Sequence, residues 1–252
     1  ELKGAKRYLE LSEREITDIY KSYLDTTLEA VINFQPDLIH VQHLSLISWV
    51  ARYIAAFKKI KYIITSHGSD LYNILADRRY FPLCEDAVRN AKAITVVSGN
   101  SRSQFLKMFG RPFAKNIHII PGGVDMSLYP TQFNTSSIDK KYKIKDKKLV
   151  LFTGRLTSHK GVRYLVRAAR DIKGELFIIG GGPEKQYLVT LVERRGLKNV
   201  HLLGYVPYEE LVKFYYRADI FVAPSVWDEP LGLTILEAMA SKTPVVATRK
   251  GG

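Results

Sequence analysis

The segment "PSVWDEPLGLTILEAMASKTPVV" (Pro224–Val246) contains an acidic loop, a helix pattern and the start of an apolar strand pattern. Apolar residues recur at helical spacing after Gly232–Leu233, and Pro244 ends this pattern before the apolar run that follows. Glu229 therefore precedes the predicted helix, whereas Glu237 lies inside it. A charged outer face of one helix does not explain both carboxylates, so their function must depend on what lies between them.

Apolar runs rich in Val and Ile alternate with helix patterns along the whole chain. Amphipathic helix patterns occur, for example, at residues 12–34 and 183–196. Nine apolar runs predict strands: residues 37–41, 61–65, 93–97, 117–120, 149–153, 176–180, 200–204, 219–223 and 244–248. This alternation predicts the α/β class with parallel sheets, and the continuous apolar strands indicate that helices cover both faces of each sheet.

The alternation is interrupted once, between Pro121 and Lys148, where prolines, glycines and polar residues form no long periodic segment. The chain has 252 residues, which is more than one typical domain. We therefore expect two α/β domains, residues 1–135 and 136–252. Because open parallel sheets bind ligands beyond the carboxyl ends of their strands, we expect the binding residues in the loops that follow the strands.

The composition is that of a soluble globular protein, with 46% apolar and 25% charged residues. The longest apolar run, Leu46–Phe57, contains Arg52 and is shorter than the ~20 residues that span a bilayer. The single cysteine, Cys84, excludes an intrachain disulfide framework and favours a cytoplasmic location. The sequence contains no cysteine cluster typical of a metal site, and we expect neither a metal nor a cofactor.

The formal charge of +13 indicates a basic surface, which attracts phosphates of nucleic acids, anionic lipids or nucleotides. A solvated surface explains the same charge. The densest basic run, Asp139–Lys148, is diluted by acidic residues and lacks interleaved aromatic residues. Charge alone therefore leaves the partner open.

A glycine-flanked basic loop follows the predicted strand at 149–153. In "GRLTSHKG", Arg155 and Lys160 stand between Gly154 and Gly161. A guanidinium can bind two phosphate oxygens at once, and an ammonium adds a point charge, so the pair suits a diphosphate. In isolation, a solvated basic turn explains the loop equally well.

A second loop, "GGGP" (Gly180–Pro183), follows the strand at 176–180. A dinucleotide-binding fingerprint requires Gly at position 185, which is Lys here, and no suitably placed acidic residue follows. We therefore expect these glycines, Gly182 among them, to allow a close approach of ligand or backbone.

The predicted helix start near Gly232–Leu233 offers free N–H groups and a dipole that favours an anion. Glu229 would repel that anion, but it can accept hydrogen bonds from the neutral hydroxyls of a sugar. Glu237, further along the helix, can do the same for a second diol such as a ribose. The arrangement predicted for Glu229, the diphosphate and Glu237 is that of a nucleotide-sugar.

Several motifs resemble, in order and spacing, the GT-B retaining glycosyltransferases of family four. In the second domain these are "GRLTSHKG", "IGGGP", "LGYVP" and the segment beginning at Pro224, in which Glu229 and Glu237 match the family's Glu-x7-Glu pair. In the first domain, "PDLIHVQH", "TSHGSDLY", "AKAITVVS" and "IIPGGVD" are similar to the segments at the family's strand ends.

The resemblance implies a GT-B fold, in which two Rossmann-like domains face a cleft, with the acceptor mostly on the first domain and the donor mostly on the second. It also implies that Glu229 contacts the donor sugar, that Glu237 contacts the ribose, and that Arg155 and Lys160 bind the diphosphate. Gly154 and Gly182 belong to the expected donor site.

The remaining implied contacts are also on strand-end loops. The backbone at Gly232–Leu233 is expected to reach the distal phosphate, and Val206 is expected to lie near the base. His67, in "SHGSD", matches the histidine that faces the sugar from the first domain. His40 and His43 are assigned structural roles.

The chain departs from the family at several positions. Gly122 stands where Asn is common, and Lys242 stands where Gly is frequent after the helix, so we expect the turn there to be built differently. The family's first strand with its glycine-rich loop is missing before Glu1, and the family continues beyond Gly252. We therefore expect the first domain to be incomplete at its start and the second at its end.

The implied reaction moves a sugar from a nucleoside diphosphate sugar to a hydroxyl of a sugar, glycan or lipid-linked acceptor, with retention of configuration. Arg155, Lys160 and the helix start would stabilise the departing diphosphate without a metal, and His67 and Glu229 would orient the sugar. The expected location is cytoplasmic, with peripheral membrane contact as a further expectation.

Two alternatives stay open at this point. A nucleotide-sugar epimerase or phosphorylase can share the same architecture, because a fold alone does not determine chemistry. A basic nucleic-acid-binding protein would use the charge of +13, but glycine loops at strand ends argue against it, and nucleic acid is not an expected partner.

Overall fold

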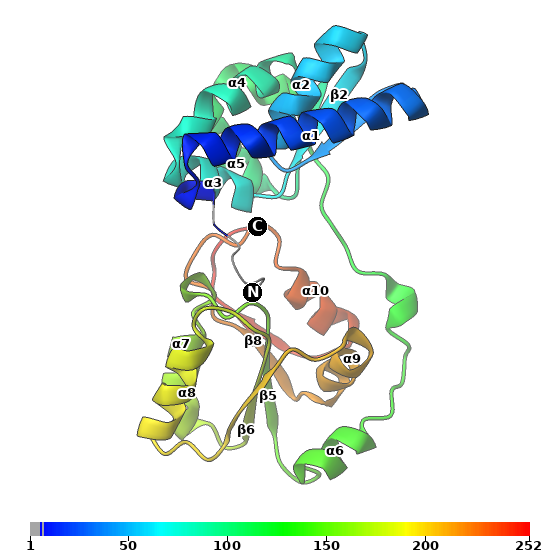
Figure 1. Cartoon of the computed structure of the whole chain (residues 1–252). Coiled ribbons are helices and arrows are strands. Elements are labelled where there is room, and N and C mark those ends of the chain that lie inside the picture. Colours follow the sequence, from blue (N-terminus) through cyan, green and yellow to red (C-terminus); the bar gives the residue numbers. More distant parts are fainter. Residues whose placement is uncertain (1–5, 7) are drawn as a thin grey trace. The chain divides into compact units, whose positions relative to one another are not determined.

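The computed structural model describes residue 6 and residues 8–252 of the chain. Contacts divide the chain into two compact units, one that ends at Pro121 and one that spans Gly122–Gly251 (Figure 1). The segment 122–135, which the sequence assigns to the first domain, makes its side-chain contacts with the second unit. The hydroxyls of Tyr129 and Tyr208 lie 2.5 Å apart, and the Tyr216 hydroxyl donates to the Pro130 carbonyl.

The first unit contains a parallel four-stranded sheet in the order β1-β2-β3-β4. Its strands are β1 (Leu38–Gln42), β2 (Lys61–Ser66), β3 (Ala93–Val96) and β4 (Ile117–Ile119). Its helices are α1 (Glu13–Phe34), α2 (Leu46–Lys58), α3 (Ser69–Ala76), α4 (Phe81–Asn90) and α5 (Gly99–Phe109). Its 3-10 turns are Tyr8–Glu10, Arg78–Tyr80 and Arg111–Asn116.

Helix α1 begins with a reciprocal cap. The Ser12 hydroxyl accepts from the Glu15 N–H at 3.3 Å, and the Glu15 carboxylate accepts from the Ser12 N–H at 2.8 Å. The helix packs on α2 through a cluster that includes Val31, Val50 and Ile54. The longest apolar run of the chain is thus an amphipathic core helix, and no helix in the described part of the chain is long and apolar enough to cross a bilayer.

The second unit contains a parallel five-stranded sheet in the order β7-β6-β5-β8-β9. Its strands are β5 (Leu149–Thr153), β6 (Glu175–Ile179), β7 (Val200–Gly204), β8 (Ile220–Ala223) and β9 (Val245–Ala247). Its helices are α6 (Ser136–Tyr142), α7 (Val162–Ala168), α8 (Lys185–Arg194), α9 (Tyr208–Arg217) and α10 (Leu233–Ala240). Its 3-10 turns are Met126–Leu128, Ser158–Lys160 and Ala169–Asp171.

The strand order of the second sheet reverses between β5 and β8. The chain moves from β5 outward to β6 and β7, and then returns to the other side of β5 to add β8 and β9. The connections that leave β5 and β8 therefore diverge, which opens a crevice at the carboxyl ends of these two strands. This switch point is where a ligand is expected in the second unit.

Helices pack on both faces of the second sheet, with α7 and α8 on one side and α9 and α10 on the other (Figure 1). Neighbouring strand residues alternate between two cores, since Phe177 contacts the α9 side and Ile178 the α7–α8 side. Every residue of β6 is buried. The α/β class, the parallel sheets and all nine predicted strands are confirmed, with boundaries that differ by at most one residue at either end.

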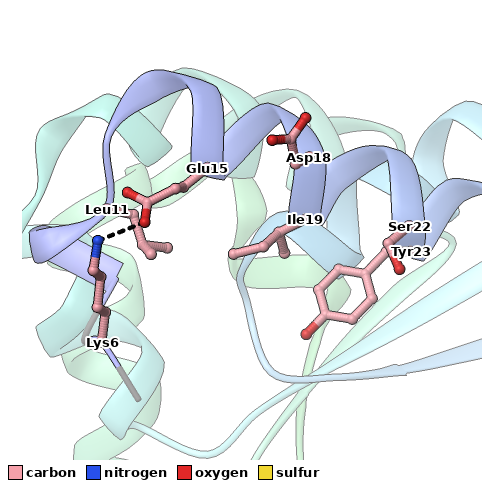
Figure 2. A pocket seen from close by; sticks show the side chains of 7 residues that line it. All are labelled: Lys6, Leu11, Glu15, Asp18, Ile19, Ser22 and Tyr23. Carbon is pink, nitrogen blue, oxygen red and sulfur yellow. Dashed lines mark hydrogen bonds and ion pairs between the residues drawn. The ribbon is translucent and has the colours of Figure 1, made fainter. Parts of the chain in front are cut away.

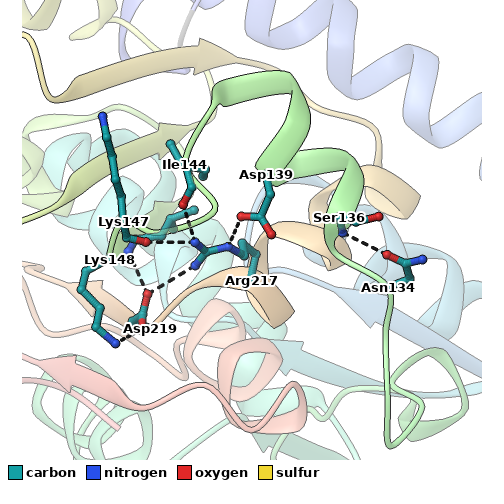
Figure 3. Close-up of polar contacts among 9 residues, drawn as sticks. Asn134, Ser136, Asp139, Ile144, Lys147, Lys148, Arg217 and Asp219 are labelled. Carbon is teal, nitrogen blue, oxygen red and sulfur yellow. Dashed lines mark hydrogen bonds and ion pairs between the residues drawn. The ribbon is translucent and has the colours of Figure 1, made fainter.

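The side chain of Arg217 joins three segments at the amino ends of these strands (Figure 3). Its Nε donates to Asp139 in α6 at 2.5 Å, and one Nη donates to Asp219 at 3.3 Å. The other Nη donates to the carbonyls of Ile144 and Lys147, at 2.8 and 2.9 Å. The guanidinium thereby adds charged donors to two turn carbonyls outside the helices and strands, and it attaches the segment around α6 to the sheet.

The turn after α10 differs from the sequence-based expectation. Lys242 adopts the left-handed conformation, with φ of 61°. The N–H of Lys242 donates to Met239 at 2.9 Å, and the N–H of Thr243 donates to Ala238 at 2.9 Å. The turn is therefore the one that Gly usually makes, and the expectation of a different turn was wrong. The hydrogen bonds offset a conformational cost to Lys of about 1 kcal/mol.

Candidate donor site at the switch point

Glycines hold the loop after β5 against the loop after β6. The N–H of Leu156 donates to the Gly181 carbonyl at 2.8 Å. A Cβ at Gly180 would lie 1.9 Å from the Gly154 carbonyl oxygen, and one at Gly182 would lie 2.5 Å from the Leu156 carbonyl oxygen. Gly180 and Gly182 are therefore required by backbone packing, which was one of the two possibilities that the sequence left open.

The same loop after β5 also contacts the loop after β8. Gly161, with φ of 67°, leaves no room for a side chain, because a Cβ there would lie 2.0 Å from the Pro224 carbonyl oxygen. The N–H of Val226 donates to the His159 carbonyl at 2.8 Å. These two contacts bring Lys160 beside Glu229.

Lys160 and Glu229 form an ion pair of 2.6 Å. The Glu229 Oε2 that accepts from Lys160 also accepts from the Ser225 hydroxyl and the Trp227 indole N–H, both at 3.1 Å. The Lys160 side chain is 25% exposed and that of Glu229 is 16% exposed, so solvent screens this pair less than a surface pair. The sequence predicted both residues in the site but not their direct contact.

Helix α10 starts beside this ion pair. Gly232 caps the helix in the left-handed conformation, with φ of 76°, and Leu233 is its first residue. Lys160, Glu229 and Gly232 line a cleft of about 20 Å³, together with Thr153 of β5 and Thr248 after β9. Gly232 and Thr234 at the start of α10 and the Lys160 side chain therefore lie on one cleft, and a helix start beside a cation favours an anion.

Glu237, in the second turn of α10, is partly buried and accepts a hydrogen bond from the Tyr215 hydroxyl at 2.6 Å. Burial raises the pKa of Glu237, and the bond from Tyr215 opposes that rise. The Tyr215 hydroxyl also lies 2.5 Å from the hydroxyl of Thr153. Tyr215 was not predicted from the sequence, because a tyrosine on the apolar side of a helix pattern has no signal that separates it from a core residue.

The other predicted donor residues are less constrained. Arg155 is exposed, and its side chain has no hydrogen-bond or ion-pair partner among the residues that the structure describes. Val206, just after β7, packs partly buried against the core on the α9 side. Gly154, with φ of 143°, follows β5 and begins the basic loop. Their contacts with a ligand stay predictions.

His67 lies in the first unit, in the loop after β2. Its Nε2 is 2.8 Å from Gln42 Oε1, and its ring centroid is 4.4 Å from that of His43. Gln42 Nε2 is also 3.1 Å from His40 Nε2. Burial lowers the pKa of His67, and the neighbouring His43 lowers it further. His43, which was assigned a structural role, thus packs against His67, and Gln42 links His67 to His40. The sequence did not predict a role for Gln42.

A hollow in the first unit lies along α1 and has a volume of about 630 Å³ (Figure 2). Polar and apolar side chains line it, among them Glu15, Asp18 and Tyr23, and Lys6 pairs with Glu15 at 2.5 Å. None of the predicted site residues lies there. Within the described residues, no group of three or more His, Cys, Asp or Glu side chains could hold a metal ion.

Comparisons with known proteins cover both units. Residues 16–128 match the family described as Glycosyltransferase Family 4, and residues 134–252 match the family described as Glycosyl transferases group 1. The Bacillus subtilis protein YtcC is 30% identical over 236 residues, which is 86% of this chain and 56% of YtcC. A GDP-mannose-dependent alpha-(1-6)-phosphatidylinositol monomannoside mannosyltransferase of Mycolicibacterium smegmatis is 32% identical over 188 residues, or 68% of this chain and 49% of the relative.

Solved structures show the same fold. Sucrose-phosphate synthase from Thermosynechococcus elongatus superimposes with a TM-score of 0.80 at 24% identity, over 96% of this chain and 63% of that structure. Anabaena HepE in complex with UDP-glucose superimposes with a TM-score of 0.80 at 21% identity, over 91% of this chain and 64% of that structure. The chain spans about half the length of the curated relatives it matches.

Proposed function

This chain belongs to the family-four glycosyltransferases of the GT-B fold, and from that premise we propose that its protein transfers a sugar from a nucleoside diphosphate sugar to an acceptor hydroxyl, with retention of configuration. The observation that carries the proposal is the convergence of Lys160, Glu229 and the start of α10 on one cleft at the switch point of the second sheet. A cation and free N–H groups suit a diphosphate, while the carboxylate suits sugar hydroxyls.

In this proposal the donor lies along the loops after β5 and β8. Lys160, Arg155 and the N–H groups at Gly232–Leu233 bind the diphosphate, and Glu229 accepts hydrogen bonds from the donor sugar. Glu237 accepts from the ribose, and the base lies near Val206. The ion pair keeps Lys160 and Glu229 in place before the donor arrives, so less side-chain ordering remains when it binds.

The chemical step breaks the bond between the anomeric carbon and the phosphate oxygen and forms a bond to the acceptor oxygen on the same face. The acceptor proton passes to the departing phosphate oxygen. Arg155, Lys160 and the α10 start stabilise the charge on that diphosphate, so the proposal includes no metal ion or other cofactor. His67 contributes from the first unit, where its lowered pKa keeps it neutral and able to exchange hydrogen bonds with sugar hydroxyls.

The proposed donor and acceptor classes follow the relatives. HepE was solved with UDP-glucose, and the mycobacterial relative is named as a mannosyltransferase that acts on a phosphatidylinositol monomannoside. We include sugars, glycans and lipid-linked sugars as acceptors, a cytoplasmic location and a peripheral contact with membranes. Nucleic acid is not part of the proposal.

Calorimetric titration of uridine, guanosine and adenosine diphosphates tests the donor site. We expect one of them to bind, and Lys160→Met to weaken it by about 10- to 100-fold, because a charge-assisted contact is lost. The matched control is Lys148→Met, since Lys148 also forms an ion pair, with Asp219 at 2.8 Å, but its side chain is 75% exposed. Equal affinity of folded Lys160→Met and the unmodified chain would reject the assignment.

A further inference from the structure

Three hydroxyl-bearing or acidic side chains form a continuous chain of hydrogen bonds beneath the switch point. Thr153 ends β5, Tyr215 lies in α9 and Glu237 lies in α10. The oxygen atoms of Thr153 and Tyr215 are 2.5 Å apart, and Tyr215 Oη is 2.6 Å from Glu237 Oε2. These hydrogen bonds thus join β5, at the centre of the sheet, to α10, the helix that starts at the donor cleft.

The direction of both hydrogen bonds follows from the chemistry of the groups. An ionised carboxylate only accepts, so the single Tyr215 proton points at Glu237. The Tyr215 oxygen must then accept from the Thr153 hydroxyl. The Thr153 hydroxyl therefore donates to the Tyr215 oxygen, and the Tyr215 hydroxyl donates to the Glu237 carboxylate, which carries the negative charge.

Tyr215 is held rigidly enough to set the position of its partner. It is 0% exposed, and its ring packs against Phe221 with centroids 5.7 Å apart. Its backbone carbonyl accepts from the Thr243 hydroxyl at 2.5 Å, which also ties α9 to the turn after α10. A hydrogen bond from such a side chain restricts the rotamers of Glu237.

We propose that Tyr215 is a positioning residue for donor binding: its hydroxyl occupies Glu237 Oε2, so that Oε1 is presented to the two ribose hydroxyls of the nucleotide. The inference rests on the proposed function, because it takes the ribose contact of Glu237 from there. It adds that an entirely buried residue, which never touches the ligand, determines the strength of that contact.

The environment of Glu237 explains why a hydrogen bond from Tyr215 matters. Burial favours the neutral carboxyl group and raises the pKa of Glu237, while the bond from Tyr215 acts in the opposite direction. Among the described residues, the Tyr129 hydroxyl also acts on these side chains, and burial is the main cause that raises its pKa. Tyr215 is thus the group that favours the charged, accepting form of Glu237.

Tyr215→Phe removes one hydroxyl and keeps the ring, so it tests the hydrogen bond with little change in packing. NMR titration of the Glu237 carboxyl in the ligand-free chain should show a higher pKa in Tyr215→Phe than in the unmodified chain. The matched control is Tyr216→Phe, which removes the next hydroxyl along the helix, one that donates to the Pro130 carbonyl instead. An unchanged Glu237 pKa in Tyr215→Phe would overturn the inference without reference to any ligand.

A second measurement compares the best-binding nucleoside diphosphate with its 2′,3′-dideoxy counterpart. Tyr215→Phe should weaken the ribonucleotide by about 10-fold and leave the dideoxy compound within about two-fold, since only the former has the hydroxyls that Glu237 binds. Equal weakening of both would mean that Tyr215 has only a structural role, and would overturn the inference. If the unmodified chain binds both compounds equally, the ribose contact itself is wrong, and the proposed function must be revised at that point.

Discussion

The carboxyl edges of the two sheets are held in different ways. In the second unit the backbone holds the loops, through the bonds from Leu156 to Gly181 and from Val226 to His159. In the first unit a backbone bond from His43 to Thr65 is accompanied by side-chain bonds, since Gln42 joins His40 to His67, and Thr65 joins His40 to Thr95. The backbone contacts leave no room for a Cβ at Gly161, Gly180 and Gly182, whereas side-chain bonds depend on which polar groups are present.

Sheet order explains where each arrangement occurs. In the second sheet the strand order reverses between β5 and β8, and the loops after these two strands contact each other before their helices, α7 and α10, go to opposite faces. The described strands of the first sheet run in simple succession, β1-β2-β3-β4. The difference predicts that glycine substitutions damage the second edge far more than changes of polar residues damage the first.

The largest expected effect is that of Gly180→Ala. The new Cβ would lie 1.9 Å from the Gly154 carbonyl oxygen, and φ at this position is 138°, so the loops after β5 and β6 must separate. We expect a loss of about 3 kcal/mol or more in the free energy of unfolding, measured by urea denaturation.

Gly181→Ala is the control in the same loop, because within the described residues no atom beyond its chain neighbours lies within 4 Å of the position that its Cβ would take. It should change the free energy of unfolding by no more than about 0.5 kcal/mol. Similar losses for the two variants would show that backbone packing does not hold this edge together.

The opposite edge of the second sheet offers the next test. Arg217→Met should cost about 3 kcal/mol, because Asp139 and Asp219 lose their guanidinium partner and the carbonyls of Ile144 and Lys147 lose a charged donor. The Arg217 side chain is only 12% exposed. Thermal or urea denaturation measures the effect.

Arg89→Met in the first unit is the matched change. Its side chain is 60% exposed and pairs with Glu85 one helical turn away, so we expect a cost of about 0–1 kcal/mol. A loss at Arg89 as large as that at Arg217 would contradict the view that burial makes the difference.

The smallest effect should be the same in both units. Lys242 after α10 and Lys59 after α2 are both left-handed, with φ of 61° and 57°. Lys242→Gly and Lys59→Gly should each stabilise the chain by about 1 kcal/mol, because the strain is local to the backbone. Lys147→Gly is the control, since Lys147 has no positive φ and should show no gain. Opposite signs for Lys242→Gly and Lys59→Gly would mean that the surrounding unit determines the result.

Much of the fold could be predicted from the sequence because strands depend on local patterns. Buried parallel strands need continuous apolar runs, and each of the nine runs became a strand. The helix start at Gly232–Leu233 and the long helix after Ser12 were predicted from periodicity. The segment 122–135 was assigned to the first domain, because proline- and glycine-rich sequence does not reveal which unit its tyrosines contact.

The candidate site could be predicted only in part. Motif resemblance identified Lys160, Glu229 and Glu237, but it could not show that Lys160 and Glu229 pair directly or that Tyr215 binds Glu237. Gln42 was missed beside His67 for the same reason. Each of these contacts depends on side-chain geometry, which residue spacing does not contain.

The sequence by itself determined the strand and helix positions, the glycines of the strand-end loops and the residue types available for a nucleotide-sugar. Only the tertiary structure decided which of those residues meet. Lys160 and Glu229 are 69 residues apart, and Thr153 and Tyr215 are 62 apart. Such pairs form because β8 returns to the side of β5, and that strand order is set by the packing of helices on both faces of the sheet, which no local stretch of sequence encodes.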